Sequence, residues 1–183
     1  ADPRSLLIRV LATAARSTPE GLSAEDMIGF VEESFGAFQE REVVETWQWD
    51  RDHVARALHD LVAHALIEST ALGTFRLTPL GRMAGEAGVE VETIVRLVDA
   101  LGPVPSADLK DVALLAATQL AVELDAVYFP INKQSTVKEP QVWMGELRRQ
   151  GIPAPILAGL QRSVPDQVTV TLRAKKAVAS ILW

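Results

Sequence analysis

The stretch that most constrains the fold reads RLTPLGRMAGEAG, residues 76–88, and holds three glycines and two arginines. It either forms a phosphate-binding loop or joins a β-wing to the next helix. Thr78 suits a helix N-cap, Pro79 the first helical position and Gly88 the helix stop. We therefore predict a packed helix whose glycines allow close approach of a neighbour. Its predicted apolar face comprises Leu80, Met83, Ala84 and Ala87.

Motifs for catalysis and metal binding do not match this sequence. A P-loop needs G-x-x-x-x-G-K-[ST], but none of the five lysines follows a glycine, and Gly81, Gly85 and Gly88 do not fit G-x-G-x-x-G. The three histidines, at 53, 59 and 64, lack the i, i+4 spacing that brings two imidazoles to one metal. No G-x-S-x-G elbow occurs either. We therefore predict no catalytic, cofactor-binding or metal-binding residue in this chain.

Before the opening stretch, the apolar spacing predicts three helices and a hairpin. The helices cover residues 4–16, 22–35 and 50–67, and the hairpin turns at Gly73. Ser23 with Asp26 resembles a capping box, and Asp50 suits the third N-cap. The buried side of the second helix is predicted to comprise Leu22, Met27, Phe30, Val31 and Phe35. Trp47 and Trp49 precede the third helix, where we favour core anchors over base-stacking platforms.

The second half is predicted to be entirely helical. After a helix near 89–101, Gly102, Pro103 and Pro105 mark the best domain boundary, and Ser106 is expected to cap a long apolar helix reaching residue 128. Shorter helices follow at 140–151, 153–164 and 169–183. The fold is thus predicted to be mainly α with a small β-hairpin wing. A winged helix at 1–101 would be followed by a helical bundle at 106–183.

Charge separates the two halves of the chain. Residues 1–100 hold nine arginines and no lysine against 17 acidic residues, a net charge of −8, whereas residues 101–183 have a net charge of +2. Nucleic-acid binding needs positive charge, so the second half is the better candidate. Contacts made there would be to the nucleic-acid backbone and would not depend on the base sequence. The candidates are Lys133, Lys138, Arg148, Arg149, Arg173, Lys175 and Lys176.

The ends and the composition bear on cellular context. The chain lacks cysteine, a signal-peptide pattern and any run of 18 apolar residues, which predicts a soluble cytoplasmic protein without membrane contact. It begins without Met, and its last helical pattern ends on Leu182 and Trp183 without a stop signal. We expect a monomeric fragment of a longer protein.

The segments SLLIRVLATAA, LSAEDMIGFVEESFGAF, HVARALHDLVAHALIES and TFRLTPLGRMAGEAGV together resemble a known domain. It is the winged helix that follows the second motor domain of Ski-two-like superfamily-two DEAD/DEAH-box helicases. The L-I-E wing and the RLTPLGR joint are the most specific pieces. From DLKDVALLAATQL to RAKKAVASILW the chain looks like the start of the helical, or ratchet, domain of that family.

This resemblance implies that the parent protein is an ATP-dependent helicase, a hydrolase, with DNA favoured as its substrate. ATP and Mg would be bound by two upstream RecA-like motor domains, which are the expected partners within the same polypeptide. The winged helix would act as a hinge on the motor, and the helical part would contact single-stranded nucleic acid. The ratchet helix would begin near residue 171 or lie beyond Trp183.

Two alternatives remain open. A winged-helix transcription regulator would read duplex DNA through residues 50–64. That segment carries Asp52 and Asp60 as well as Arg51 and Arg56, and it contains no Asn, Gln or Lys to read bases. A protein-interaction module would show exposed apolar patches.

Overall fold

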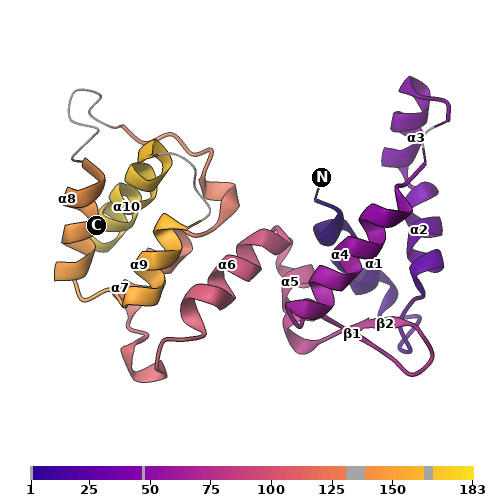
Figure 1. Ribbon diagram of the computed structural model, residues 1–183, viewed down its shortest axis with the longest axis horizontal. Helices are drawn as coiled ribbons and strands as arrows, with labels where there is room; N and C mark the ends of the chain where they lie inside the picture. Colours follow the sequence, from indigo (N-terminus) through magenta and orange to yellow (C-terminus); the bar gives the residue numbers. More distant parts are fainter. Residues whose placement is uncertain (1, 47, 131–138, 163–166) are drawn as a thin grey trace. The chain divides into compact units, whose positions relative to one another are not determined.

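A computed structural model describes residues 2–46, 48–130, 139–162 and 167–183. The chain divides into two compact units, Ala1–Val91 and Glu92–Trp183. The fold is mainly helical with one small two-stranded antiparallel sheet (Figure 1), which confirms the predicted combination of helices and hairpin. No helix within these four ranges is both long enough and apolar enough to cross a bilayer.

Among the described residues of the first unit, four helices precede the sheet and one follows it. The strands pair with Ile67 opposite Leu77, and Leu22 forms one further antiparallel bridge to Phe75. In chain order the elements are α1 (Pro3–Ala14), α2 (Ala24–Glu32), α3 (Phe35–Val43), α4 (Arg51–Ala63), β1 (Ile67–Ser69), β2 (Phe75–Leu77) and α5 (Pro79–Ala87). The core of the unit includes Leu7, Ile8, Leu11, Met27, Val31, Val54, Leu58, Leu61, Leu66 and Ile67.

The predicted caps of α2 and α4 are confirmed. Ser23 accepts a hydrogen bond from the Asp26 N–H, and the Asp26 carboxylate accepts one from the Ser23 N–H, which completes a capping box. The Ser23 hydroxyl also donates to the Asp26 carboxylate at 2.6 Å, and this hydrogen bond, followed by the one from the Ser23 N–H, lowers the pKa of Asp26. Asp50 accepts from the Asp52 and His53 N–H groups at the start of α4.

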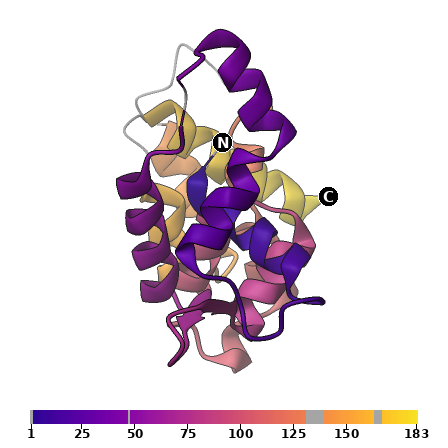
Figure 2. The ribbon, with the colours of Figure 1, turned by 90° about the vertical axis from the view of Figure 1, so that its right-hand side faces the viewer.

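The second predicted helix is in fact two helices. Ser34 has an extended backbone and accepts a hydrogen bond from the Ala37 N–H, so α2 ends and α3 begins at this residue. In Figure 1 and Figure 2, α3 contacts α2 and extends away from α1, α4 and α5. Phe30 was predicted to be buried, but it is 51% exposed because α2 buries Met27, Ile28 and Val31 instead.

Most of the segment 76–88 forms α5, which is a packed helix. The Thr78 hydroxyl accepts from the Gly81 N–H and donates to the Ala65 carbonyl, Pro79 is the first helical residue, and Gly88 ends the helix at φ 68°. These predictions are confirmed. Trp49 before α4 is half-buried, and Trp47 lies outside the described residues.

The buried face of α5 differs from the predicted one. Met83 is 67% exposed, whereas Gly81 and Ala84 are buried. A Cβ on Gly81 would overlap the Leu66 carbonyl, and one on Gly85 would lie 2.8 Å from the Ala12 Cβ. The neighbouring backbone lies so close to α5 that only small residues fit on its inner face. Gly81 and Ala84 therefore face inward, and Met83 faces outward.

The second unit consists of helices. α10 packs against α7, α8 and α9 around a core formed by residues including Ala116, Leu120, Met144, Leu147, Ile156, Leu160 and Ala177. In chain order the elements are α6 (Val91–Leu101), the 3-10 helix η1 (Ser106–Asp108), α7 (Asp111–Thr118), the 3-10 helix η2 (Val122–Leu124), α8 (Glu139–Arg149), α9 (Ala154–Gln161) and α10 (Gln167–Leu182).

The long helix predicted from residue 106 to 128 is broken at two places. Lys110 has an extended backbone that separates η1 from α7, and α7 ends at Thr118. The Thr93 hydroxyl on α6 accepts a hydrogen bond from the Val122 N–H at 3.0 Å. That backbone group is thus satisfied from another element, so the apolar sequence does not need to continue as one helix.

The helix predicted near 89–101 was assigned to the first domain, but it packs in the second unit. Ala100 belongs to the buried core of that unit, and Leu97 and Leu101 pack against it. The division between the units accordingly falls at Val91 and Glu92, one helix before the Gly102–Pro105 connection.

Candidate single-strand interface

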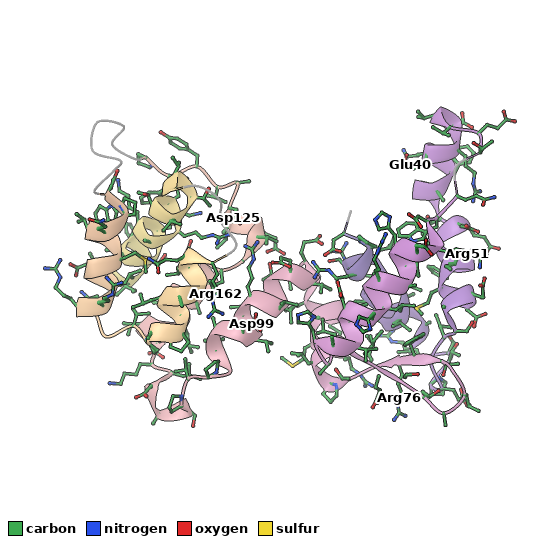
Figure 3. All side chains as sticks on the ribbon, in the orientation of Figure 1. Glu40, Arg51, Arg76, Asp99, Asp125 and Arg162 are labelled. Atoms are coloured by element: carbon green, nitrogen blue, oxygen red, sulfur yellow. The ribbon has the colours of Figure 1, made fainter. Side chains whose placement is uncertain are left out.

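Arg173, predicted as a surface cation, is buried in the second unit. Its side chain is 2% exposed and forms a two-pronged ion pair with Asp125, labelled in Figure 3, with Nε–Oδ1 at 2.7 Å and Nη2–Oδ2 at 2.5 Å. Burial alone would raise the pKa of Asp125, but the hydrogen bonds and charges of Arg173 and then Arg96 lower it. Arg173 stabilises the unit and offers no free surface to a strand.

Lys176 was also predicted to contact nucleic acid and is also buried. Its Nζ donates to the Leu124 carbonyl at 2.5 Å. Burial lowers the pKa of Lys176, an effect that the Asp125 charge opposes and the Arg173 charge reinforces. Both inward-facing cations of α10 therefore hold the η2 segment.

Lys175 lies at the edge of the unit in a cage of protein groups. Its Nζ donates to the Pro130 carbonyl at 2.7 Å and to the Glu139 carboxylate at 3.2 Å. It also lies 5.4 Å from the Trp143 ring centroid and 5.9 Å from that of Phe129. With 20% of its side chain exposed, Lys175 is mainly a structural cation.

The end of α8 presents the remaining described candidates. Arg148 and Arg149 are exposed in its last turn, where positive charge also suits the helix dipole. Arg149 pairs with Glu146 one turn earlier and stays 74% exposed. Lys133 and Lys138 lie outside the described residues.

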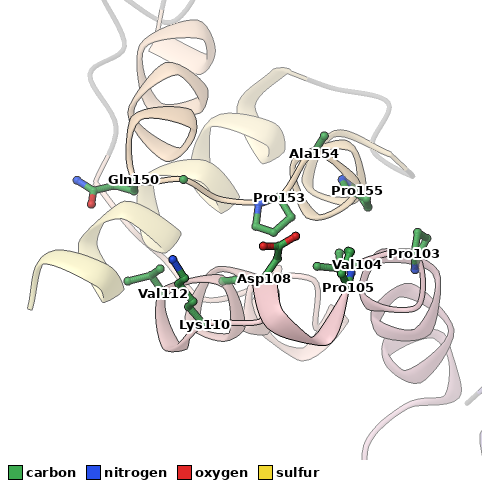
Figure 4. Close-up of a pocket in the computed structure, with 12 residues that line it drawn as sticks. Pro103, Val104, Pro105, Asp108, Lys110, Val112, Gln150, Pro153, Ala154 and Pro155 are labelled. Carbon is green, nitrogen blue, oxygen red and sulfur yellow. The ribbon is translucent and has the colours of Figure 1, made fainter.

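A groove close to this helix end is lined by a cation, Lys110, that was not among the predicted site residues. It has a volume of about 390 Å³ and lies between η1, the start of α7 and the connection from α8 to α9 (Figure 4). Lys110 lies on one side and Gln150, the residue after Arg149, on the other. The charge of Lys110 was visible in the sequence, but nothing local to it indicated that it lines a groove with the connection between α8 and α9.

The groove walls limit what it can bind. Four prolines line it, and they bring rigid backbone without N–H donors: Pro103, Pro105, Pro153 and Pro155. In Figure 4 the Asp108 carboxylate points toward Pro153. Among the lining side chains Lys110 is the cation, and the Asp108 carboxylate opposes a continuous run of negative charge. Such a site suits a few phosphate contacts without base reading.

Within the described ranges, no group of three His, Asp or Glu side chains is placed to hold a metal ion. No protein family, curated protein or solved structure matches the chain. Function is therefore inferred from the residues and their geometry.

Proposed function

We propose that this chain is a non-catalytic accessory part of an ATP-dependent nucleic-acid helicase. Its first unit is a winged helix that acts as a structural hinge on RecA-like motor domains, and its second unit contacts single-stranded nucleic acid. ATP and Mg would be bound by the motor domains. The observation that carries this proposal is the packing of α5: its glycines face the Leu66 carbonyl and Ala12, so the RLTPLGR segment is a joint.

The arrangement around the hairpin supports a winged helix. Helix α4 leads directly into β1, and Thr78 ties the exit of β2 to the Ala65 carbonyl at the end of α4. Leu22, in the connection between α1 and α2, adds a bridge to Phe75 on the hairpin. A wing attached at three points is suited to a rigid joint.

The surface of α4 supports a hinge and argues against a sequence reader. Arg51 is engaged by Glu25 at 2.5 Å. Asp52 and Asp60 are exposed on the same helix, as is Arg56. Duplex phosphates would meet carboxylates along this helix, which a recognition helix in the major groove avoids.

Strand contact by the second unit would be weak and salt-dependent. The exposed cations in the described part of this unit are Lys110, Arg148, Arg149 and Arg162, whereas the candidates Arg173 and Lys176 are buried. Two or three phosphate contacts give a shallow salt dependence of affinity.

Fluorescence anisotropy with labelled single-stranded and duplex oligonucleotides at about 50 mM and about 200 mM salt tests the proposal. We expect weak single-strand binding that salt suppresses and no preference among duplex sequences. Arg148→Gln should lower single-strand affinity, and Arg56→Gln on α4 is the matched control that should not. Tight, sequence-selective duplex binding lost in Arg56→Gln, or ATP turnover by this chain alone, would contradict the proposal.

A protein-interaction module is the second candidate, and the surface of α2 and α3 favours it. Phe30 is 51% exposed, and Val43 and Val44 at the end of α3 are 83% and 50% exposed. Exposed apolar side chains in neighbouring elements are typical of docking surfaces. If the oligonucleotide titrations show no binding at low salt, this function replaces strand contact for the isolated chain.

A further inference from the structure

We infer that the first unit binds a short protein segment in which an apolar side chain lies next to carboxylates. The site is formed by α1, β2 and α5 and is independent of strand contact by the second unit. It consists of two hollows that share the residues Ala15, Leu77 and Arg82. Arginines line one hollow, and the other, here called the apolar hollow, combines six apolar residues with the polar side chains of Thr18, Glu68, Arg76 and Arg82.

The arginine hollow has a volume of about 560 Å³. Arg9 and Thr13, four residues apart, line it from one face of α1, and Arg16 lines it from the turn that follows this helix. Arg82 faces them from α5. The convergence brings together three of the eight arginines in residues 1–91, so it is a concentration of charge and not an average feature of this acidic unit.

Two of these arginines are free to take a ligand. Arg9 is engaged by Glu90 at 3.3 Å and by the Gly88 carbonyl. Arg16 and Arg82 are exposed, and their guanidinium groups form no hydrogen bond or ion pair with any residue that the structure describes. Each presents a planar fork of donors, which matches the two oxygens of a carboxylate.

The apolar hollow continues from Arg82 and has a volume of about 280 Å³. Leu11, Pro19, Leu22 and Leu77 contribute to its lining. Its polar rim carries the ion pair of Arg76, labelled in Figure 3, with Glu68 at 2.7 Å. Such a hollow fits a single aliphatic side chain of a ligand. Because Arg82 lines both hollows, this aliphatic residue would lie close in the ligand sequence to the carboxylate that Arg82 binds.

The surroundings favour a protein segment over a nucleic-acid strand. Residues 1–91 hold eight arginines against 15 acidic residues, a net charge of −7. Glu86 lines the arginine hollow and Glu68 the apolar one. A continuous polyanion would pass both carboxylates, and no lining residue of either hollow is aromatic, so a base has no stacking platform. One or two carboxylates beside an aliphatic group avoid both problems.

The test uses arginine Nε–Hε signals of the isotope-labelled chain, titrated with a blocked tetrapeptide of sequence LSEE. We expect saturable shifts at Arg16 and Arg82. The matched peptides SSEE and LSQQ each remove one half of the proposed recognition and should bind at least about fivefold more weakly. An oligothymidylate is the nucleic-acid probe and should leave these two signals unchanged.

Variants of the exposed arginines complete the test. Arg16→Gln and Arg82→Gln should each weaken LSEE binding roughly tenfold, whereas Arg56→Gln on α4 should have no effect. Backbone amide spectra establish that each variant is folded. Arg82→Lys keeps the charge but loses the fork, and should bind between wild type and Arg82→Gln. Equal binding of SSEE and LSEE, wild-type affinity in Arg82→Gln, or an oligothymidylate shift at Arg16 and Arg82 would overturn the inference.

Discussion

Asp125 is held by Arg173 from a position 48 residues away in sequence, through two hydrogen bonds of 2.7 and 2.5 Å. Arg96 on α6 reaches the same carboxylate at 3.3 Å. One carboxylate therefore connects α6, the η2 segment and α10. Because Arg173 is 2% exposed and Asp125 28%, the arginine depends on this partner much more than the carboxylate depends on the arginine.

Removing the carboxylate should destabilise the second unit strongly. Asp125→Ala leaves the Arg173 guanidinium buried without its counter-charge, and we expect a loss of about 3 kcal/mol in the free energy of unfolding. Urea denaturation followed through amide signals of core residues such as Ile156 measures it. The double variant Asp125→Ala with Arg173→Met removes the stranded charge and should recover part of the loss. A loss below about 1 kcal/mol in Asp125→Ala would mean that the pair is not structural.

The same carboxylate should determine part of the acid sensitivity. The folded-state pKa of Asp125 lies below its ordinary value of 3.8. The folded protein thus binds this proton less readily than the unfolded chain, and the resulting stabilisation is fully present above the ordinary value. It is lost as the pH falls through the lower folded pKa. Asp125→Asn should flatten this part of the stability curve, measured by urea denaturation at a series of pH values. If the free energy of unfolding of Asp125→Asn fell at low pH as steeply as that of the wild type, other carboxylates would be responsible for the acid sensitivity.

Two helical glycines provide a sharp contrast in packing. Gly81→Ala places a Cβ against the Leu66 carbonyl, and we expect the free energy of unfolding to fall by about 2 kcal/mol. Gly29→Ala on α2 is the matched control, since no atom lies within 4 Å of the added Cβ. That variant should gain about 0.5–1 kcal/mol from helix propensity. Thermal unfolding compares the two. Equal effects would contradict the close packing of α5 described above.

Local signals in the sequence predicted local structure well. Ser23, Asp50, Thr78 and Gly88 mark helix ends through contacts within a few residues, so their roles follow from the sequence alone. Periodicity was less informative about burial. It grouped Met83 with Ala84, but the approach of neighbouring backbone selects Gly81 for the inside instead.

The candidate site was harder to predict because its contacts are distant in sequence. Arg173 and Lys176 look like ordinary surface cations until Asp125 and the Leu124 carbonyl are placed beside them. The Thr93 hydroxyl that meets the Val122 N–H comes from another helix, so the break in the predicted long helix has no local signal.

The joint at the start of α5 can be tested through Thr78. Its side chain accepts from the Gly81 N–H at 3.1 Å and donates to the Ala65 carbonyl at 2.7 Å. Thr78→Ala removes both hydrogen bonds and should cost about 1–2 kcal/mol in the free energy of unfolding. Thr78→Ser keeps the hydroxyl and should stay within about 0.5 kcal/mol of wild type. Urea denaturation distinguishes them, and similar losses in both variants would instead indicate a role for the threonine methyl group.

Two lysines of the second unit should separate strand contact from stability. Lys110 is exposed on the rim of the groove, whereas Lys175 is engaged by Glu139, the Pro130 carbonyl and two aromatic rings. Lys110→Gln should therefore reduce the salt dependence of single-strand binding by about 0.7 in the slope of log K against log salt, without changing stability.

Lys175→Gln is the matched charge removal for that experiment. It should leave the slope unchanged but lower the free energy of unfolding by about 1 kcal/mol, because the Glu139 carboxylate, of whose side chain 9% is exposed, loses its counter-charge. Anisotropy titrations at several salt concentrations and urea denaturation supply the two readouts. If Lys175→Gln reduced the slope of log K against log salt and Lys110→Gln did not, the prediction would be wrong. The strand would then bind at the edge of α10 and not at the proline-lined groove.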